Sequence, residues 1–440
     1  MKFFKYLPLL SFLIILPSCQ DDEEPYVPSE EQTKVSTTVL AYFIAENNLL
    51  SNEYGANYIQ NNLDMMKKGM KNAPKGANFL VYLDDGASPT LFRYVKDKKG
   101  NVSKMNLRIY PDQYSTDPRV MNKVISDAFS FYPADSLGLI LSSHGSGSLY
   151  DSFSYKEMNS DEFIQKRVFG VEAIDRPANG IYTEETLSYT MNITDLEEAL
   201  RGIPKLQYIL FDACLMGNIE TAYELRDKAK YYIASPNSTP ALGYPYQQIM
   251  SSLLKMGAYD LSTVASTYYT YYATNTYAED DYASTAVLNL EKMESFAQSF
   301  DEMLQSPIAL QKLERIARKD MQLYEANSNT PTETPSYPLY DISLLIDSIA
   351  PTPEIAQSMR SELRKLITFY VHGQYMTVSA YGNLILPYNS NRICGMTVYI
   401  PPLSPEKELP YRRYYPHLAW YRDSGLNRSI RYNTEDTELQ

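Results

Sequence analysis

Cysteine, tryptophan and histidine are all scarce in this chain, which has 3, 1 and 3 of them among 440 residues. An exported domain held together by disulfides would carry more cysteines, in an even and closely patterned set. Stability must therefore come from a hydrophobic core, and a chain of this length can build one or two. A bridge between Cys214 and Cys394 is an alternative, but Cys214 has a better explanation below.

Positive charge is also in short supply, with 40 Lys and Arg against 53 Asp and Glu and a formal net charge of -13. Removal of residues 1–18, which include Lys2 and Lys5, changes this to -13 - 2 = -15. So acidic a protein is not expected to hold nucleic acid or anionic lipid by charge. The charge suits the attraction of basic peptides, or it is simply a solvated surface.

The apolar run at the N-terminus, Leu7 to Leu16, is too short to span a bilayer, which needs about 20 residues. Lysines precede this run and a small residue follows it, which indicates a signal peptide over residues 1–18. The sequence Leu16-Pro17-Ser18-Cys19 resembles a bacterial lipobox, so Cys19 is the predicted lipidation site. An ordinary signal peptide or an uncleaved anchor is the alternative.

The segment after Cys19 begins Gln-Asp-Asp-Glu-Glu-Pro, and residues 19–34 are expected to form an acidic, flexible tether. It resembles the surface-export signals of Bacteroidetes lipoproteins, although a plain linker explains it equally well. We therefore expect an exported protein, lipid-anchored to the bacterial outer membrane, with surface exposure as a further expectation.

Short apolar runs alternate with helical patterns from residue 35 onward. We expect strands at 35–44, 78–82, 136–143, 206–211 and 231–235, with helices at 52–70, 119–131, 194–201 and 218–229. Strands that are apolar throughout and alternate with helices predict an α/β fold, with a mostly parallel sheet covered on both faces. A hairpin is expected at 91–95 and 105–110, and a polar insertion at about 150–190.

The rest of the chain predicts further helices at 262–277, 291–320 and 353–370, and strands at 284–290 and 396–400. A stretch rich in Thr, Pro and Ser at 327–338 suggests a boundary. We therefore divide the mature chain into a core domain, 35–300, and a C-terminal subdomain, 301–440, that completes the fold.

Two strand ends carry the chemistry. His144 leaves the expected strand 136–143, and Cys214 leaves the expected strand 206–211. Ligands of open α/β sheets bind at the carboxyl ends of strands, so a thiol and an imidazole there can form a nucleophile–base pair. A helix start near Gly217 would favour the thiolate. The backbone N–H groups beside Gly145 and of Cys214 are the expected donors to an oxyanion.

Each of these residues also has a plainer interpretation. A cysteine at a strand end is often a small core residue, and His-Gly is often only a turn. His372-Gly373 repeats the His-Gly pair but follows an expected helix, so it ranks below His144. His417 and Cys394 are expected to be structural.

The segments LILSSHGSG, ending at Gly147, and FDACLMGNIE, starting at Phe211, resemble the clostripain peptidases, family C11 of the caspase-like clan. Asp-Ala-Cys-Leu-Met-Gly is a specific string, and SPNSTPALGYPY, GMTVYIP and Trp420 support it. The resemblance covers roughly residues 35–425. It implies a caspase-like α/β/α sandwich with a C-terminal helical and strand extension, and a His144–Cys214 dyad that needs no third residue.

The resemblance also implies a substrate. Clostripain relatives cleave peptides after Arg or Lys, and Asp212 matches an acidic position close to their nucleophile. Asp212 is therefore the predicted substrate-binding residue, with a strand-end cap as its alternative role. Many relatives carry an acid after the residue that corresponds to Ser235, whereas this chain has Pro236. That departure weakens the expectation of a strict basic P1 residue.

Two more family properties concern activation. Relatives are often activated by self-cleavage between the histidine and the cysteine, and this segment holds Lys156, Lys166, Arg167 and Arg176. Some relatives respond to calcium, but this sequence has no Asp-rich loop with a Gly turn and a closing Glu. We therefore predict neither a cofactor nor an obligatory metal.

The alternative function is a surface binding lipoprotein on a peptidase scaffold that has lost turnover. Abundant tyrosine, 40 residues, and Pro236 favour it, whereas retention of His144 and Cys214 favours the peptidase. An α/β hydrolase is not supported, because no Gly-x-Ser-x-Gly elbow follows a strand.

Overall fold

The structure is a computed structural model. It describes residues 35–86, 88–147, 169–174, 177–182, 188–275, 282–316, 321–324, 339–377, 385–388, 390–400 and 414–430. The predicted signal peptide, the lipidation site Cys19 and the acidic tether lie outside these residues.

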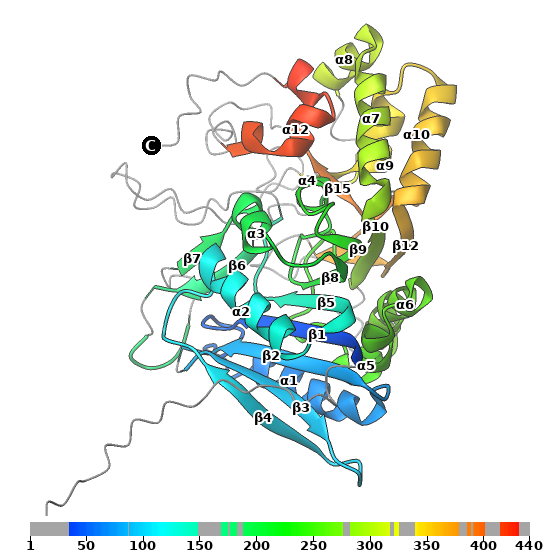
Figure 1. Cartoon of the computed structure of the whole chain (residues 1–440). Helices are drawn as coiled ribbons and strands as arrows, with labels where there is room; N and C mark the ends of the chain where they lie inside the picture. The colour runs from blue at the N-terminus through cyan, green and yellow to red at the C-terminus, as the bar shows by residue number, and fades with distance from the viewer. Residues whose placement is uncertain are drawn as a thin grey trace, which may run out of the picture.

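A nine-stranded sheet organises the described part of the chain, in the order β12-β10-β9-β8-β5-β1-β2-β3-β4 (Figure 1). Its strands are β1 (Val35–Ile44), β2 (Ala77–Asp84), β3 (Thr90–Lys96), β4 (Val102–Ile109), β5 (Ala134–Ser142), β8 (Leu206–Asp212), β9 (Ala229–Ala234), β10 (Ser284–Asn289) and β12 (Ile367–His372). The central strands β9, β8, β5, β1 and β2 pair in parallel. The four outer strands are antiparallel. The mostly parallel sheet that the sequence predicts is confirmed.

Helices cover both faces of this sheet. The α-helices of the described residues are α1 (Tyr58–Gly69), α2 (Pro118–Phe131), α3 (Ile193–Ala199), α4 (Ile219–Glu224), α5 (Tyr246–Lys255), α6 (Ala258–Asn275), α7 (Met293–Leu304), α8 (Pro307–Glu314), α9 (Ile342–Ile349), α10 (Pro353–Leu366) and α12 (Ala419–Asp423). Alternate residues of β1 divide between two cores: Leu40 and Tyr42 pack with α2, whereas Val39 and Ala41 pack with α1, α5 and α6. This period-2 division is why the strand is apolar throughout its length.

Three short two-stranded sheets lie outside the large one. They pair β6 (Phe169–Ala173) with β7 (Ser188–Met191), β11 (Leu339–Asp341) with β15 (Thr397–Tyr399), and β13 (Tyr375–Thr377) with β14 (Ile385–Pro387). The β6–β7 pair falls within the segment that the sequence suggests is only a polar insertion. β15 lies beside the Cys214 loop, since the N–H of Thr397 donates to the Gly217 carbonyl at 2.9 Å.

Several predicted helix boundaries are wrong. The helix predicted over 353–370 ends at Leu366, and the β-branched run that follows forms strand β12 beside β10. His372 therefore ends a strand and does not follow a helix. The helix predicted over 218–229 is only the six residues of α4, and α5 and α9 were not predicted. At residues 367–372 the pairing with β10 overrides the local helical pattern.

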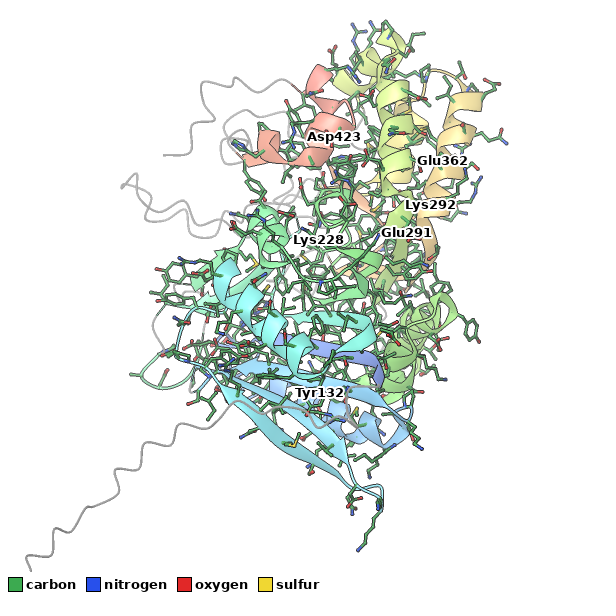
Figure 2. All side chains as sticks on the ribbon, viewed as in Figure 1. Tyr132, Lys228, Glu291, Lys292, Glu362 and Asp423 are labelled. Atoms are coloured by element: carbon green, nitrogen blue, oxygen red, sulfur yellow. The ribbon has the colours of Figure 1, made fainter. Side chains whose placement is uncertain are left out.

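The C-terminal part of the chain packs into the same core as the sheet. Trp420 of α12 is fully buried, stacked on Phe296 of α7 with ring centroids 6.1 Å apart. It also makes an edge contact with Tyr223 of α4. The Tyr223 hydroxyl donates to Asp423 at 3.0 Å, and Figure 2 places Asp423 on α12. Within the described ranges, none of the helices is both long and apolar enough to cross a membrane.

We predict that Trp420→Ala destabilises the whole protein by about 3–5 kcal/mol, because it leaves a cavity between α4, α7 and α12. Trp420→Phe keeps an aromatic contact and should cost less than half as much. Urea unfolding followed by far-UV circular dichroism measures both values. Tyr259→Ala is the control, since that ring is 84% exposed and its loss should change stability by less than about 0.5 kcal/mol.

Trp420 is the only tryptophan, so its fluorescence reports on the C-terminal segment alone. In the wild-type protein, fluorescence and circular dichroism should give the same urea midpoint. A fluorescence midpoint well below that of the circular dichroism would show that this segment unfolds separately, contrary to the shared core.

Candidate active site

The two strands that carry the predicted dyad are direct neighbours. β5 and β8 pair in parallel, and the register sets Ser142 beside Asp212 at the end of both strands. His144 and Cys214 each lie two residues beyond that pair. Both are partly buried, at the same carboxyl edge of the sheet. The structure therefore brings the imidazole loop and the thiol loop together, as the sequence predicts.

Glycine is required where these two loops touch. A Cβ added at Gly145 would lie 2.4 Å from the Cys214 carbonyl oxygen, so only glycine allows this approach. A Cβ at Gly217 would lie 2.6 Å from the backbone nitrogen of Pro236. Leu215, next to the cysteine, has a positive φ of 61°, which is uncommon for a residue with a side chain. The loop holding Cys214 is thus tightly packed and locally strained.

The sulfur of Cys214 contacts Thr239, a residue that the sequence analysis did not identify. The Thr239 backbone N–H donates to Sγ at 3.3 Å, and the Thr239 hydroxyl lies at the same distance. A backbone N–H aimed at sulfur favours the thiolate over the thiol. The helix that was expected to do this, α4, begins five residues beyond Cys214, at Ile219.

The ring of His144 contacts Asn48, another residue that the sequence analysis missed. Nε2 of His144 lies 2.6 Å from Oδ1 of Asn48, in the loop between β1 and α1. Nothing in the local sequence around Asn48 indicates this role, because β1 and β5 are about 90 residues apart and only their pairing joins them. The one available signal was that Asn48 also follows the carboxyl end of a buried strand.

Asp212 is brought to the same edge but is deeply buried, with only 7% of its surface exposed. Its carboxylate accepts the Tyr246 hydroxyl at 2.7 Å and a hydrogen bond from the Tyr244 backbone. Burial raises the pKa of Asp212 to about 6, and these two hydrogen bonds oppose the rise. Gly243, with φ of +66°, leaves room for the carboxylate, since a Cβ there would lie 2.5 Å from it.

The departure at Pro236 also has a structural setting. Pro236 is buried behind Gly217, and the following Asn237 is fully buried. The Asn237 amide oxygen accepts from the Ser235 hydroxyl at 2.8 Å, and its nitrogen donates to the Tyr388 hydroxyl at 3.2 Å. This segment holds its own loop together and presents no carboxylate.

His372 and Cys394, the other candidates, contact Tyr388 and Asp341 respectively. His372 lies at the end of β12, stacked against Tyr370 with centroids 5.1 Å apart. Burial raises the pKa of the Cys394 thiol well above its usual range, and the nearby Asp341 carboxylate adds to the rise. Cys214 and Cys394 are both free thiols, so the disulfide alternative does not hold.

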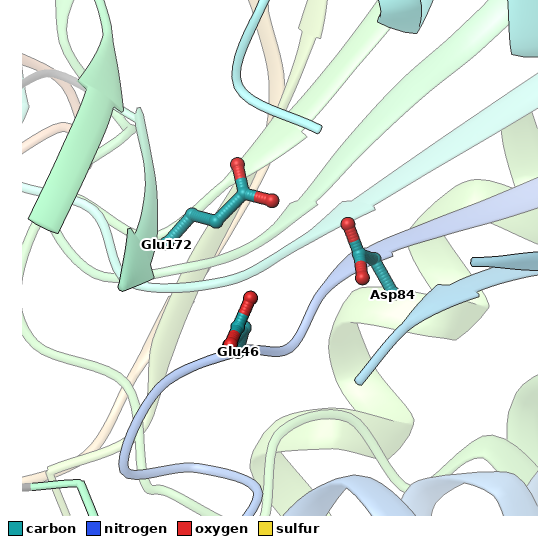
Figure 3. A group of neighbouring side chains, drawn as sticks. All are labelled: Glu46, Asp84 and Glu172. Atoms are coloured by element: carbon teal, nitrogen blue, oxygen red, sulfur yellow. The ribbon is translucent and has the colours of Figure 1, made fainter. Parts of the chain in front are cut away.

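One cluster of carboxyl groups could hold a hard cation or share a proton. Oxygen atoms of Glu46, Asp84 and Glu172 lie within 4.8 Å of one another (Figure 3). Burial, and then the Asp84 charge, raise the pKa of Glu172 to about 8. The N–H groups of Ser115 and Thr116 donate to Glu172 at 2.9 and 3.0 Å. These residues come from three distant segments, so no loop motif reveals the cluster in the sequence.

Two predictions from the sequence stay predictions. The oxyanion role of the N–H groups beside Gly145 and of Cys214 stays a prediction from the sequence. The basic residues of the proposed self-cleavage segment, Lys156, Lys166, Arg167 and Arg176, lie outside the described residues.

Comparisons with protein families, curated proteins and solved structures all find peptidases of the same family. The model of the clostripain family, named for peptidase C11, matches residues 41–430. Clostripain of Hathewaya histolytica is 24% identical over 252 residues, which cover 51% of this chain and 43% of that protein. The match thus spans less than half the length of this curated relative.

Solved structures that resemble nearly the whole chain include two C11 proteases. One is a secreted C11 cysteine protease from Bacteroides thetaiotaomicron in complex with an irreversible peptide inhibitor, with 27% identity and a TM-score of 0.70. The similarity covers 89% of this chain and 99% of that one. The other is an inactive zymogen of a C11 protease from Parabacteroides distasonis, with 26% identity, a TM-score of 0.70, and 91% and 99% coverage.

We predict that the buried carboxyl of Asp212 makes stability fall as pH rises. Its pKa is about 6 when folded, against an ordinary value of 3.8, so the folded state holds the proton more tightly. The contribution of protonated Asp212 to the free energy of unfolding is complete below pH ~4 and is lost by about pH 6–7. In Asp212→Asn this fall of about 3 kcal/mol in the free energy of unfolding should be absent. Urea unfolding at each pH measures it.

Tyr246→Phe is the matched control for this measurement. It removes a hydroxyl that lowers the pKa of Asp212, so the loss of stability should extend to higher pH. Identical pH slopes in the wild-type protein and in Asp212→Asn would show that this carboxyl does not titrate as its burial requires.

Proposed function

The chain belongs to the clostripain family of cysteine peptidases, and we propose that it is an exported, lipid-anchored endopeptidase that cleaves peptide bonds with Cys214 and His144. The observation that carries the proposal is the parallel pairing of β5 with β8, with Ser142 beside Asp212. Because the two strands end together, the thiol and the imidazole emerge from adjacent positions of one sheet edge. The similarity to solved C11 cysteine proteases over most of the chain supports the same function.

The proposed reaction proceeds in two steps. His144 takes the proton from the Cys214 thiol, and the sulfur attacks the carbonyl carbon of the scissile peptide bond. The carbon–nitrogen bond then breaks as His144 returns the proton to the leaving amine, which leaves a thioester on Cys214. In the second step His144 takes a proton from water, the hydroxide attacks the thioester, and the acid product leaves as the proton returns to sulfur.

Two features of the chain support this use of Cys214. The Thr239 N–H donates to Sγ, which stabilises the negative charge that the sulfur carries before attack. The close approach of Gly145 to the Cys214 carbonyl sets the backbones of both loops side by side. We propose the N–H groups beside Gly145 and of Cys214 as donors to the developing oxyanion. No cofactor or metal takes part in these steps.

We propose that the substrate is a peptide or protein, with a preference for Lys or Arg before the cleaved bond. The chain is acidic overall, and Asp212 lies at the end of β8, two residues from the nucleophile. A pKa of about 6 leaves this carboxylate mostly ionised at neutral pH. Its burial means that it can act on a substrate only as a charge beneath a pocket, while Pro236 supplies no second acid.

The anchor is proposed from the N-terminal sequence alone. Cys19, preceded by a short apolar run and followed by acidic residues, is the proposed site of lipid attachment. This would hold the peptidase on the bacterial outer membrane through the tether of residues 19–34. The proposal includes no nucleic-acid partner, in keeping with the net negative charge.

We predict that a peptide electrophile ending in Lys or Arg labels Cys214, and that Cys214→Ala abolishes both labelling and cleavage of a peptide library. The probe reacts only with an accessible thiolate that is positioned for attack. Labelling and turnover should persist in EDTA. Cys394→Ala is the matched control, because the raised pKa of the Cys394 thiol keeps it protonated and it should not react.

The same variants test the preference for a basic residue, the proposed self-cleavage and the alternative function. A probe ending in norleucine should react more slowly than the Lys probe, and Asp212→Asn should narrow that difference. Conversion of the wild-type chain to shorter bands, absent in Cys214→Ala, would support self-cleavage between His144 and Cys214. A wild-type protein that binds peptides but is neither labelled nor active would favour the alternative, a binding lipoprotein.

For the anchor, we predict that the full-length chain partitions with membranes when expressed in a Gram-negative host and takes up labelled palmitate. Cys19→Ala should lose the palmitate label and appear in the soluble exported fraction. Cys394→Ala serves again as the control and should remain in the membrane fraction. Equal membrane retention of Cys19→Ala without its lipid would contradict a lipid anchor.

A further inference from the structure

The contact between Asn48 and His144 points to a third residue in the proposed site. We infer that Asn48 is a positioning residue, whose amide oxygen holds the His144 ring and leaves Nδ1 as the nitrogen that accepts the thiol proton. The inference rests on the proposed function, since it concerns the same dyad. It goes beyond a dyad that works with two residues alone.

The chemistry of the contact decides the tautomer. Oδ1 of Asn48 lies 2.6 Å from Nε2, and an amide oxygen can only accept a hydrogen bond. Nε2 must therefore carry a hydrogen, which leaves the lone pair of the neutral ring on Nδ1. When the ring takes the thiol proton, the Nε2–H remains and becomes a stronger donor, so Asn48 also stabilises the imidazolium.

The backbone holds the donor and the acceptor in a fixed relation. Asn47 and Ser143, the residues directly before Asn48 and His144, both donate to the carbonyl oxygen of Ile44, at 2.9 and 3.0 Å. Both are buried, with 4% and 3% exposed. A shared acceptor between the two loops means that Asn48 and His144 cannot move apart independently.

A second set of hydrogen bonds ties the same two loops to β6. The Asn47 amide donates to the Val171 carbonyl at 2.8 Å, and the Val171 N–H donates to the Ser143 hydroxyl at 3.1 Å. The Asn47 side-chain oxygen accepts the Leu49 N–H at 2.9 Å, which sets the chain direction through Asn48. So many contacts by the residue before Asn48 explain how a short side chain can be held against His144.

A neutral amide beside Nε2 of His144 affects the imidazole differently from a carboxylate in the same position. A carboxylate on Nε2 would raise the pKa of the imidazole strongly, whereas an amide orients the ring with a smaller effect on the pKa. The carboxylate nearest in sequence is that of Glu46, which instead accepts from the Tyr182 hydroxyl at 3.3 Å within the acidic cluster (Figure 3). The site thus uses an amide for His144 and keeps this carboxylate apart.

The test compares Asn48→Ala and Asn48→Asp in the full chain. Asn48→Ala should lower kcat by about 10- to 100-fold with KM changed by less than about twofold, because the ring loses its orientation and not its substrate contacts. The limb of the pH profile that His144 governs should move to lower pH in Asn48→Ala. In Asn48→Asp, which keeps an acceptor, it should move to higher pH by about one unit, with most of kcat retained.

Asn52→Ala is the matched control. Asn52 lies in the same loop and its side chain accepts the N–H groups of Tyr54 and Ala56, without contacting His144. Any loss of stability in the loop should appear in this variant, with kcat and the pH profile unchanged. Melting temperatures of all three variants separate unfolding from a change at His144.

A readout independent of turnover separates the two proposals. The pH dependence of Cys214 alkylation by iodoacetamide, followed by mass spectrometry, reports on the thiol–imidazole pair and should show the same opposite shifts. If peptides are not cleaved but the shifts appear, the endopeptidase proposal fails and Asn48 still positions His144. Unchanged pH profiles in both Asn48 variants, with wild-type activity present, would overturn the inference.

Discussion

The parallel pairing of four neighbouring strands is the constraint on which the rest of the structure depends. The register of β2, β1, β5 and β8 sets Leu83, Phe43, Ser142 and Asp212 in one row at the carboxyl edge of the sheet. The chain leaves each strand at this edge, so short loops deliver side chains to a common place. His144 and Cys214 each follow this row by two residues, and Glu46 follows it by three. A slip of one residue in any pair would turn these side chains to the other face.

Close contact between the loops then turns this arrangement into a site. Gly145 lies against the Cys214 carbonyl, and Gly217 lies against the backbone of Pro236. The left-handed conformation of Leu215 is maintained because its N–H donates to the Asn237 carbonyl at 3.1 Å and its side chain is buried. The strain is thus held by the surrounding core, as is common where a backbone must present a reactive group.

Charge around the site is arranged by burial more than by ion pairs. Asp212 and Glu172 both have a raised pKa because each carboxyl is withdrawn from water, while the hydrogen bonds that each accepts from backbone N–H groups oppose the rise. Asp212 lies at the end of β8, and Glu172 lies in the carboxyl cluster with Glu46 and Asp84. By contrast, His144 meets the neutral amide of Asn48. The hydrogen bonds therefore pair His144 with a neutral amide, whereas Asp212 and Glu172 accept hydrogen bonds from other residues.

The sequence by itself determined the apolar strands, their alternation with helices, and the two strand ends that carry His144 and Cys214. These features are local: a buried parallel strand must be apolar along its length, and a strand end is marked by the polar residues that follow. The exact end of a helix was harder to predict from the sequence, as residues 367–372 show. They follow a helix without a break and become β12 only because β10 offers an edge to pair with.

Only the tertiary structure decided which distant residues complete the site. Asn48 and Thr239 contact His144 and Cys214 from other loops, and no spacing in the sequence connects them. The same holds for the carboxyl cluster, drawn from residues 46, 84 and 172. Asp212 could be placed near Cys214 from the sequence, but its burial and its hydrogen bond with Tyr246 could not. Such contacts depend on how loops from separate strands pack together, and this is set by strand order and register in three dimensions.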